Sequence, residues 1–147
     1  MAFKGGELVK WLIDSVIKHL NTNFPSSIMF APVKVDLLDI GTNNTPKKSI
    51  AIRMTPSALG DQYFDGELLN KQFQILVKSD NQLEVNNTAE AIARELNNVH
   101  RRVFNAIDGS YTLRRLNVYV EPNFVEKTAV NEFIYTALFS AELYEGE

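Results

Sequence analysis

The sequence predicts an α+β fold, in which a mostly antiparallel β-sheet carries two long helices packed on one of its faces. Several segments alternate apolar and polar side chains, which is the period of a half-buried strand. Two other segments, residues 7–21 and 92–103, repeat apolar residues every three or four positions, as one face of a helix does. Strands and helices each have an apolar side, and packing these sides together would form the core.

Composition favours one globular domain, and we expect residues 1–147 to form it. The net charge of -3 disfavours a protein that binds nucleic acid by neutralising phosphates. The absence of cysteine excludes disulfides, thiolate catalysis and cysteine-ligated metal sites. No apolar run reaches the ~18 residues that a membrane span needs, so we expect a soluble protein made in the cytoplasm, with no membrane partner.

The N-terminal third is predicted to hold a helix and two strands. The helix covers about residues 7–21, and Pro25 lies beyond its end. Its apolar stripe consists of Leu8, Trp11, Leu12, Val16 and Leu20. Residues 28–40 and 49–54 then alternate, with Pro32 marking a strand start or an edge. Turn formers between these two runs indicate a hairpin.

Residues 55–67 fit neither period and predict a long loop. Loops of this length in compact domains are usually functional. The loop contains Tyr63 and Phe64, which either fold back onto the domain or enter a partner's pocket. Its carboxylates, including Asp61 and Asp65, lack the spacing of a calcium loop, so we expect them to be solvated or to face a partner.

The central third is predicted to be a strand at residues 69–77, a polar turn and a second helix. On the strand, Phe73, Ile75 and Val77 form the apolar side, and Gln72, Gln74 and Lys78 form the polar side. The helix stripe consists of Ile92, Leu96, Val99 and Val103. We expect Asn86 or Asn87 to cap this helix, and Asp108 and Gly109 to close it.

Two strands are predicted in the last third, at residues 116–120 and 132–144, joined by a polar connection over residues 122–131. The last strand is apolar on both sides, with Ile134 and Leu138 on its second side. It is therefore either a central strand or a strand whose second face is buried by another subunit.

No group of residues indicates a reaction, a metal site or a cofactor. His19 and His100 lie near the ends of different predicted helices without ligand spacing, so we expect structural or surface roles for them. Neither a serine-nucleophile motif nor a phosphate-binding glycine loop occurs. We therefore expect a protein that is not an enzyme and needs no cofactor.

Two arginine pairs flank the turn at residues 108–109: Arg101 with Arg102, and Arg114 with Arg115. They could form one basic patch. The alternative is that the first pair complements carbonyl groups at a helix end and the second lies at an exposed strand start.

Four segments carry a resemblance to a known family: Glu7–Leu12, Phe73–Val77, Ala89–Leu96 and Phe133–Leu138. With the order of the predicted elements, they resemble the tail-terminator, or head–tail joining, proteins of long-tailed bacteriophages, including minor capsid proteins of phages that infect Gram-positive bacteria. The resemblance covers about residues 7–144. Alternatives are another phage neck or tail-tube component, or a small α+β enzyme or ligand-binding domain with its site in the loop at residues 55–67.

The resemblance implies a structural protein of the virion, assembled in the host cytoplasm and located at the tail–head junction. It would form a ring, a hexamer on the tail, that stops growth of the tail tube and joins tail to head. Its partners would be the tail-tube protein and a head-completion protein, with DNA only passing through the ring. A ring needs two different contact surfaces on each subunit. The expected interface residues are Asp61, Tyr63, Phe64, Asp65, Ile134 and Leu138, and a possible DNA-facing patch is Arg101, Arg102, Arg114 and Arg115.

Overall fold

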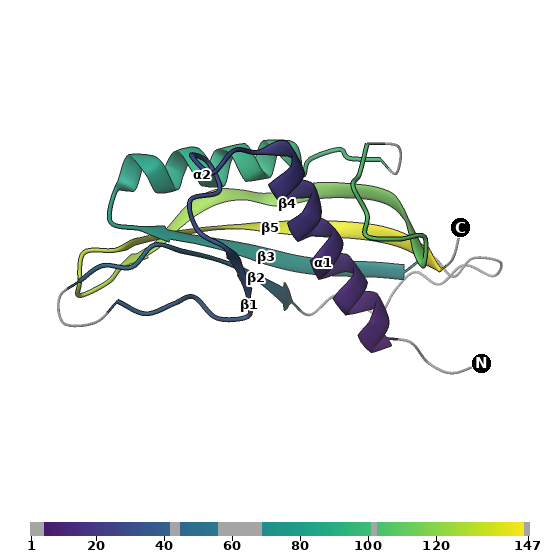
Figure 1. Cartoon of the computed structure of the whole chain (residues 1–147), viewed down its shortest axis with the longest axis horizontal. Helices are drawn as coiled ribbons and strands as arrows, with labels where there is room; N and C mark the ends of the chain where they lie inside the picture. Colours follow the sequence, from purple (N-terminus) through teal and green to yellow (C-terminus); the bar gives the residue numbers. More distant parts are fainter. Residues whose placement is uncertain (1–4, 42–44, 56–68, 101–102, 146–147) are drawn as a thin grey trace.

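The computed structural model describes residues 5–41, 45–55, 69–100 and 103–145. These residues form a five-stranded sheet in the order β1-β2-β3-β5-β4, together with two helices (Figure 1). The elements are α1 (Gly5–Asn23), β1 (Val33–Val35), β2 (Ser49–Thr55), β3 (Leu69–Ser79), α2 (Gln82–Glu95), β4 (Tyr111–Lys127) and β5 (Phe133–Glu145). All neighbouring strands are antiparallel except β1 and β2. The predicted α+β fold with a mostly antiparallel sheet is therefore confirmed.

The main hydrophobic core joins both helices to the sheet. Trp11 and Leu12 of α1 and Ile92 of α2 are buried in one cluster with residues of β2, β3, β4 and β5. Within it, Phe73 of β3 pairs with Phe139 of β5, and their rings stack with centroids 5.1 Å apart. In Figure 1, α1 crosses the strands while α2 runs nearly along them. Removing these apolar side chains from water is the main driving force for folding.

The two strands with the clearest patterns lie where the sequence predicts them. The strand predicted at residues 69–77 is β3, and its apolar residues Phe73, Ile75 and Val77 are at most 2% exposed. The last predicted strand is β5, which lies between β3 and β4. This interior position agrees with the apolar character of both its sides.

The predicted hairpin between residues 28–40 and 49–54 is wrong. Strand β1 has only three residues, because the chain before it forms a turn in which the N–H groups of Ile28 and Met29 donate to one carbonyl. This strand pairs with β2 in parallel. Asp36 adopts a φ of 72° and turns the chain out of β1.

Helix α2 begins earlier than predicted. Asn81 is its N-cap, and the side-chain oxygen of Asn81 accepts a hydrogen bond of 3.1 Å from the N–H of Glu84. The predicted caps, Asn86 and Asn87, lie inside the helix. Asparagine is one of the residues preferred at an N-cap. Because several asparagines lie near the start of this helix, the sequence alone does not tell which of them is the cap.

The same helix ends at Glu95, well before residues 108–109. Asn98 adopts a φ of 58°, a left-handed conformation that asparagine tolerates better than most residues and that a helix cannot continue through. The last two members of the predicted stripe therefore leave the helix. Val99 forms a β-bridge with β4, and Val103 is 62% exposed.

Strand β4 is longer than predicted and includes much of the predicted polar connection at residues 122–131. It contains Pro122, which an edge strand tolerates because its outer side needs no N–H group for pairing. Its register against β5 shifts at four places, and each shift disturbs the alternation of its side chains. The sequence therefore showed a clear alternation only at residues 116–120.

Candidate partner-binding surface

Along the central strands, side chains point alternately into the main core and to the opposite side of the sheet, which we call the second face. Residues 36–41, which we call the strap, pack on this second face. On this face, Ala51, Leu76 and Ile134 form a small buried cluster, and Leu38 of the strap packs against it. The second face is therefore not entirely open to solvent. At one end of this face, the strap covers the small buried cluster.

Side chains of β2 and β3 hold the backbone of the strap. The guanidinium group of Arg53 donates two hydrogen bonds, of 3.2 and 3.0 Å, to the carbonyl of Asp36. The hydroxyl of Ser49 accepts a hydrogen bond of 2.9 Å from the N–H of Asp39, and the ammonium group of Lys78 donates to the carbonyl of Asp39. The N–H of Asp36 still pairs with the carbonyl of Ile52 at 2.9 Å, and beyond it these side chains provide hydrogen-bond partners for the strap's backbone.

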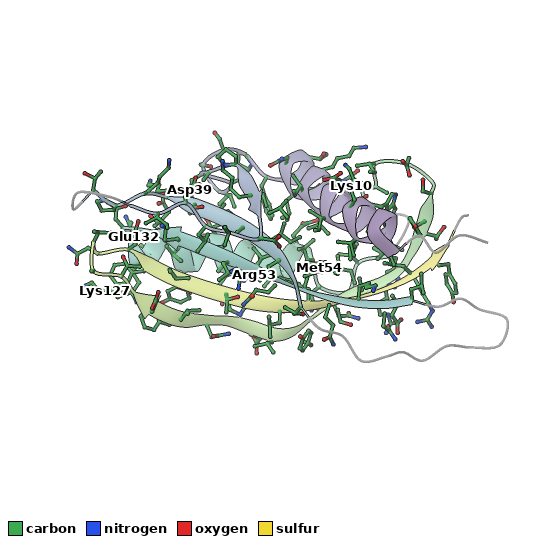
Figure 2. All side chains as sticks on the ribbon, turned by 90° about the horizontal axis from the view of Figure 1, so that it is seen from below. Lys10, Asp39, Arg53, Met54, Lys127 and Glu132 are labelled. Atoms are coloured by element: carbon green, nitrogen blue, oxygen red, sulfur yellow. The ribbon has the colours of Figure 1, made fainter. Side chains whose placement is uncertain are left out.

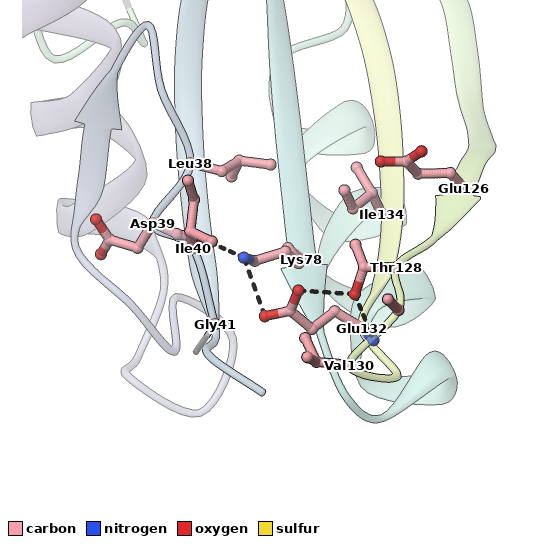
Figure 3. Close-up of a pocket in the computed structure, with 11 residues that line it drawn as sticks. Leu38, Asp39, Ile40, Gly41, Lys78, Glu126, Thr128, Val130, Glu132 and Ile134 are labelled. Carbon is pink, nitrogen blue, oxygen red and sulfur yellow. Dashed lines mark hydrogen bonds and ion pairs between the residues drawn. The ribbon is translucent and has the colours of Figure 1, made fainter. Parts of the chain in front are cut away.

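Lys78 also forms the most buried ion pair among the described residues. Its Nζ lies 3.1 Å from Oε2 of Glu132, and the two side chains are 4% and 3% exposed (Figure 3). Lys78 comes from the end of β3, and Glu132 from the turn between β4 and β5. Figure 2 places Asp39 and Glu132 at the same end of the molecule. The pair therefore links the strap to that turn.

Both carboxylate oxygens of Glu132 accept hydrogen bonds. Oε2 accepts from the backbone N–H of Lys47, and Oε1 accepts from the hydroxyl of Thr128, each at 2.8 Å. Burial alone would raise the pKa of Glu132, but the hydrogen bonds from Lys47, Thr128 and Lys78 and the charge of Lys78 outweigh it. The pKa therefore lies below its usual value, and the carboxylate is charged at neutral pH.

Gly41 lets the strap approach this pair closely. A Cβ atom at residue 41 would lie 2.6 Å from Oε2 of Glu132 and 2.6 Å from the carbonyl of Thr45. Real Cβ atoms do not make such contacts, so any other residue would push the strap away from the ion pair.

A pocket of about 340 Å³ lies between the strap and the β4–β5 turn. Leu38, Ile40, Val130 and Ile134 contribute apolar side chains to its lining, and Asp39, Lys78, Glu126 and Glu132 contribute charged ones (Figure 3). The two buried charges, those of Lys78 and Glu132, are paired with each other and with neighbouring groups of the chain. The pocket is therefore better suited to contact with apolar groups than to acid–base chemistry.

Large exposed apolar residues gather at both edges of the sheet. At the end of β1 and in the strap they are Val35, Leu37 and Ile40, which are 50%, 73% and 79% exposed. On β4 they are Tyr119, Phe124 and Val125, which are 46%, 50% and 47% exposed. Such groups of exposed apolar side chains are typical of surfaces that bind other proteins. We call them the strap patch and the β4 patch.

The predicted interface residues have different positions. Ile134 is 8% exposed and packs within its own chain, which leaves little of it for a partner, while Leu138 is half-buried. Asp61, Tyr63, Phe64 and Asp65 lie outside the described residues. The interface assignment therefore stays a prediction. Nothing in the sequence indicated the ion pair, since Lys78 was expected on the polar side of its strand and Glu132 is far from it in the sequence.

Of the four predicted patch arginines, the structure describes two. Arg114 is exposed and forms an ion pair with Glu142 of β5, and Arg115 is also exposed. Arg101 and Arg102 lie outside the described residues, so the basic patch stays a prediction.

The two histidines lie in different environments. His19 is buried, and its Nε2 lies 2.8 Å from a carboxylate oxygen of Glu95, whereas His100 is exposed. Within the described ranges, no group of three or more His, Cys, Asp or Glu residues could hold a metal ion. In the same ranges, neither helix has the length and apolar content to cross a bilayer.

Comparison with known proteins identifies the family. The sequence profile described as "Bacteriophage tail terminator protein" matches residues 38–145, which include α2 and strands β2 to β5. The chain belongs to the bacteriophage tail terminator family. Members are structural proteins of phage tails, not a class of enzymes. No curated protein sequence matches this tail terminator.

A solved structure shares the fold. A chain in the structure titled "Virion of native gene transfer agent (GTA) particle" superposes on this tail terminator with a TM-score of 0.65 and 14% sequence identity. The match covers 92% of this chain and 96% of the other. At this identity the likeness shows a common fold, and it extends the similarity to parts of the chain outside the family profile.

Proposed function

We propose that this tail terminator closes the end of the tail tube as a ring, a hexamer on the tail, and joins the tail to the head. The family match over residues 38–145 carries this proposal. The partners are the tail-tube protein on one side and a head-completion protein on the other, and DNA passes through the ring as cargo. The protein is assembled in the host cytoplasm and stays at the tail–head junction of the virion.

One domain comprising residues 1–147 would perform this role. We infer that both helices cover the same face of the sheet, because their buried residues belong to one cluster with one set of strand side chains. This arrangement leaves the second face available for other virion proteins, and it leaves the strap patch and the β4 patch exposed for contacts between subunits. Exposed Arg115, with the other predicted patch arginines, would lie towards the DNA.

Tails made without this protein test the proposal. Electron microscopy of lysates that lack the gene should show tails of uncontrolled length without heads, and a wild-type copy supplied in trans should restore joined particles. Tails of normal length joined to heads would contradict the proposed role. A lysate without any tails would instead indicate a tail-tube component.

The loop aromatics provide a second test of the predicted interface. Replacing Tyr63 and Phe64 together by alanine should leave the free energy of unfolding of the isolated protein nearly unchanged and weaken ring formation, if these aromatics bind a partner. A large loss of stability would instead show that they pack within their own domain.

A further inference from the structure

A ring with more than two subunits brings two different surfaces of each subunit together, because its contacts are heterologous. The described part of this chain has two exposed apolar patches, and they lie beside the two outermost strands, β1 and β4. We propose that, in the ring, the β4 patch of one copy packs against the strap patch of the next copy. This inference rests on the proposed ring and assigns its subunit contact.

The outer edge of β4 is paired near its middle, and its second half is open. At residues 116–118 it pairs with residues 97–99: Val99 and Leu116 exchange backbone hydrogen bonds of 3.0 Å in both directions. The N–H of Val118 also donates to the side chain of Asn97 at 3.1 Å. Beyond residue 118, no described segment pairs with the outer edge, and all three residues of the β4 patch lie in this second half. An open edge with exposed apolar side chains is a ready surface for another chain.

Pro122 in this open half determines the kind of contact. A proline has no N–H group, so it interrupts any continuous pairing with a neighbouring strand. Asn123 also donates its side-chain amide to the carbonyl of Glu121 at 2.9 Å, which occupies part of the free backbone. We therefore assign the contact mainly to the side chains of Tyr119, Phe124 and Val125 instead of to an extended ladder of backbone hydrogen bonds.

The strap is held in a conformation that exposes the side chains of the strap patch, which is the surface proposed to bind the β4 patch of the next copy. Leu38 points into the small cluster on the second face, while its neighbours Leu37 and Ile40 are the two most exposed large apolar residues among those described. The Lys78–Glu132 pair fixes the strap in this position. A surface that is rigid before binding loses less conformational entropy when its partner arrives.

A second copy of this chain is the occupant that uses both patches at once. The strap patch is aliphatic, the β4 patch is mainly aromatic, and the two lie at opposite ends of the strand order. Such a pair permits head-to-tail addition in which each copy uses both patches, as ring closure requires.

Cross-linking tests this contact directly, because the natural chain has no cysteine. The test variant carries both Ile40→Cys and Phe124→Cys, two exposed positions in the two patches. Tails assembled with this variant are treated with a short bifunctional maleimide and examined on a denaturing gel. We expect a ladder of cross-linked copies that ends at the size of the closed ring.

Three controls make the result decisive. Each single variant should give no cross-linked dimers, because a head-to-tail contact does not bring residue 40 next to residue 40 or residue 124 next to residue 124. A matched pair on the two helices, Lys10→Cys with Glu90→Cys, is also exposed and should give no ladder. A ladder from a single variant, or from the helix pair at the same rate, would overturn the proposal.

Electron microscopy of the same tails tests the proposed subunit contact separately from the proposed function. Rings at the tail end, combined with a double variant that stays monomeric on the gel, overturn the assigned contact and leave the proposed function standing. Wild-type tails that end and join normally without a ring of this protein overturn the proposed function and the contact with it.

Discussion

Nζ of Lys78 lies 3.1 Å from Oε2 of Glu132, with both side chains almost completely buried. Removing one member of such a pair leaves a charge without compensation in a place where water cannot solvate it. The variant Glu132→Gln keeps the side chain's shape and removes its charge. We expect it to lower the free energy of unfolding by about 3–5 kcal/mol, measured by urea denaturation.

The matched control is Glu126→Gln, since Glu126 also lines the pocket but is exposed. Exposed substitutions of this kind usually change stability by less than about 0.5 kcal/mol. If both variants are equally stable, the ion pair does not hold the strap.

The lowered pKa of Glu132 predicts how stability depends on pH. Because its folded-state pKa lies below the usual value of 4.5, the carboxylate stabilises the folded state above pH 4.5, and this contribution is lost as pH falls through the folded-state pKa. We therefore expect the stability difference between the natural protein and Glu132→Gln to be constant near neutral pH and to shrink below about pH 4.5.

Denaturant titrations at a series of pH values measure this difference. Glu84 and Asp108 also have lowered pKa values, the first chiefly through a hydrogen bond from Ser79 and the second through one from the backbone of Ser110. Both remain in both proteins, so their contributions cancel when the two curves are subtracted. A difference that stays constant down to acid unfolding would argue against a role for the Glu132 charge.

Two glycines differ in the space around them, which allows a controlled test of the strap. Gly41→Ala would place a methyl group 2.6 Å from Glu132 Oε2, and overpacking of this kind costs about 1–3 kcal/mol. Gly109→Ala meets nothing within 4 Å and should be neutral or slightly stabilising. Thermal unfolding of the two variants measures the contrast. Equal melting temperatures would show that the strap moves aside at little cost.

His19 is expected to be a structural residue that ties α1 to the end of α2. Its Nδ1 accepts from the backbone N–H of Asn105 at 3.1 Å, so Nε2 carries the hydrogen that Glu95 accepts at 2.8 Å. Replacing His19 by alanine removes both hydrogen bonds and leaves the buried site of the ring unfilled, so it should cost about 2–3 kcal/mol in urea denaturation. His100→Ala, at an exposed position, should cost less than about 0.5 kcal/mol. Similar losses for both would refute the structural role.

The elements that the sequence predicted correctly depend on local periodicity. In β3, Phe73, Ile75 and Val77 alternate without a bulge and all enter the core. In α1, Trp11 and Leu12 belong to a stripe that is buried as predicted. Each of these patterns is read within one segment, so no knowledge of the rest of the chain is needed.

The features that the sequence missed depend on contacts between distant segments. The parallel pairing of β1 follows from the turn at Asp36, and neither its direction nor its partner is encoded in the alternation. Lys78 and Glu132 lie in different elements, and each looks like an ordinary surface residue until the strap covers them. The candidate site was therefore less predictable than the sheet.

The N-cap of α2 is Asn81 in the structure, whereas the sequence predicted Asn86 or Asn87, and one pair of variants distinguishes these positions. Asn81 accepts the hydrogen bond from the N–H of Glu84, so Asn81→Ala removes the cap and should cost about 1 kcal/mol. Asn87 is exposed inside the helix, where alanine has the higher helix propensity, so Asn87→Ala should be neutral or stabilising by up to about 0.7 kcal/mol. Urea denaturation of both variants decides between the two positions. A loss confined to Asn87→Ala would place the helix start where the sequence pattern predicted it and would contradict the cap at Asn81.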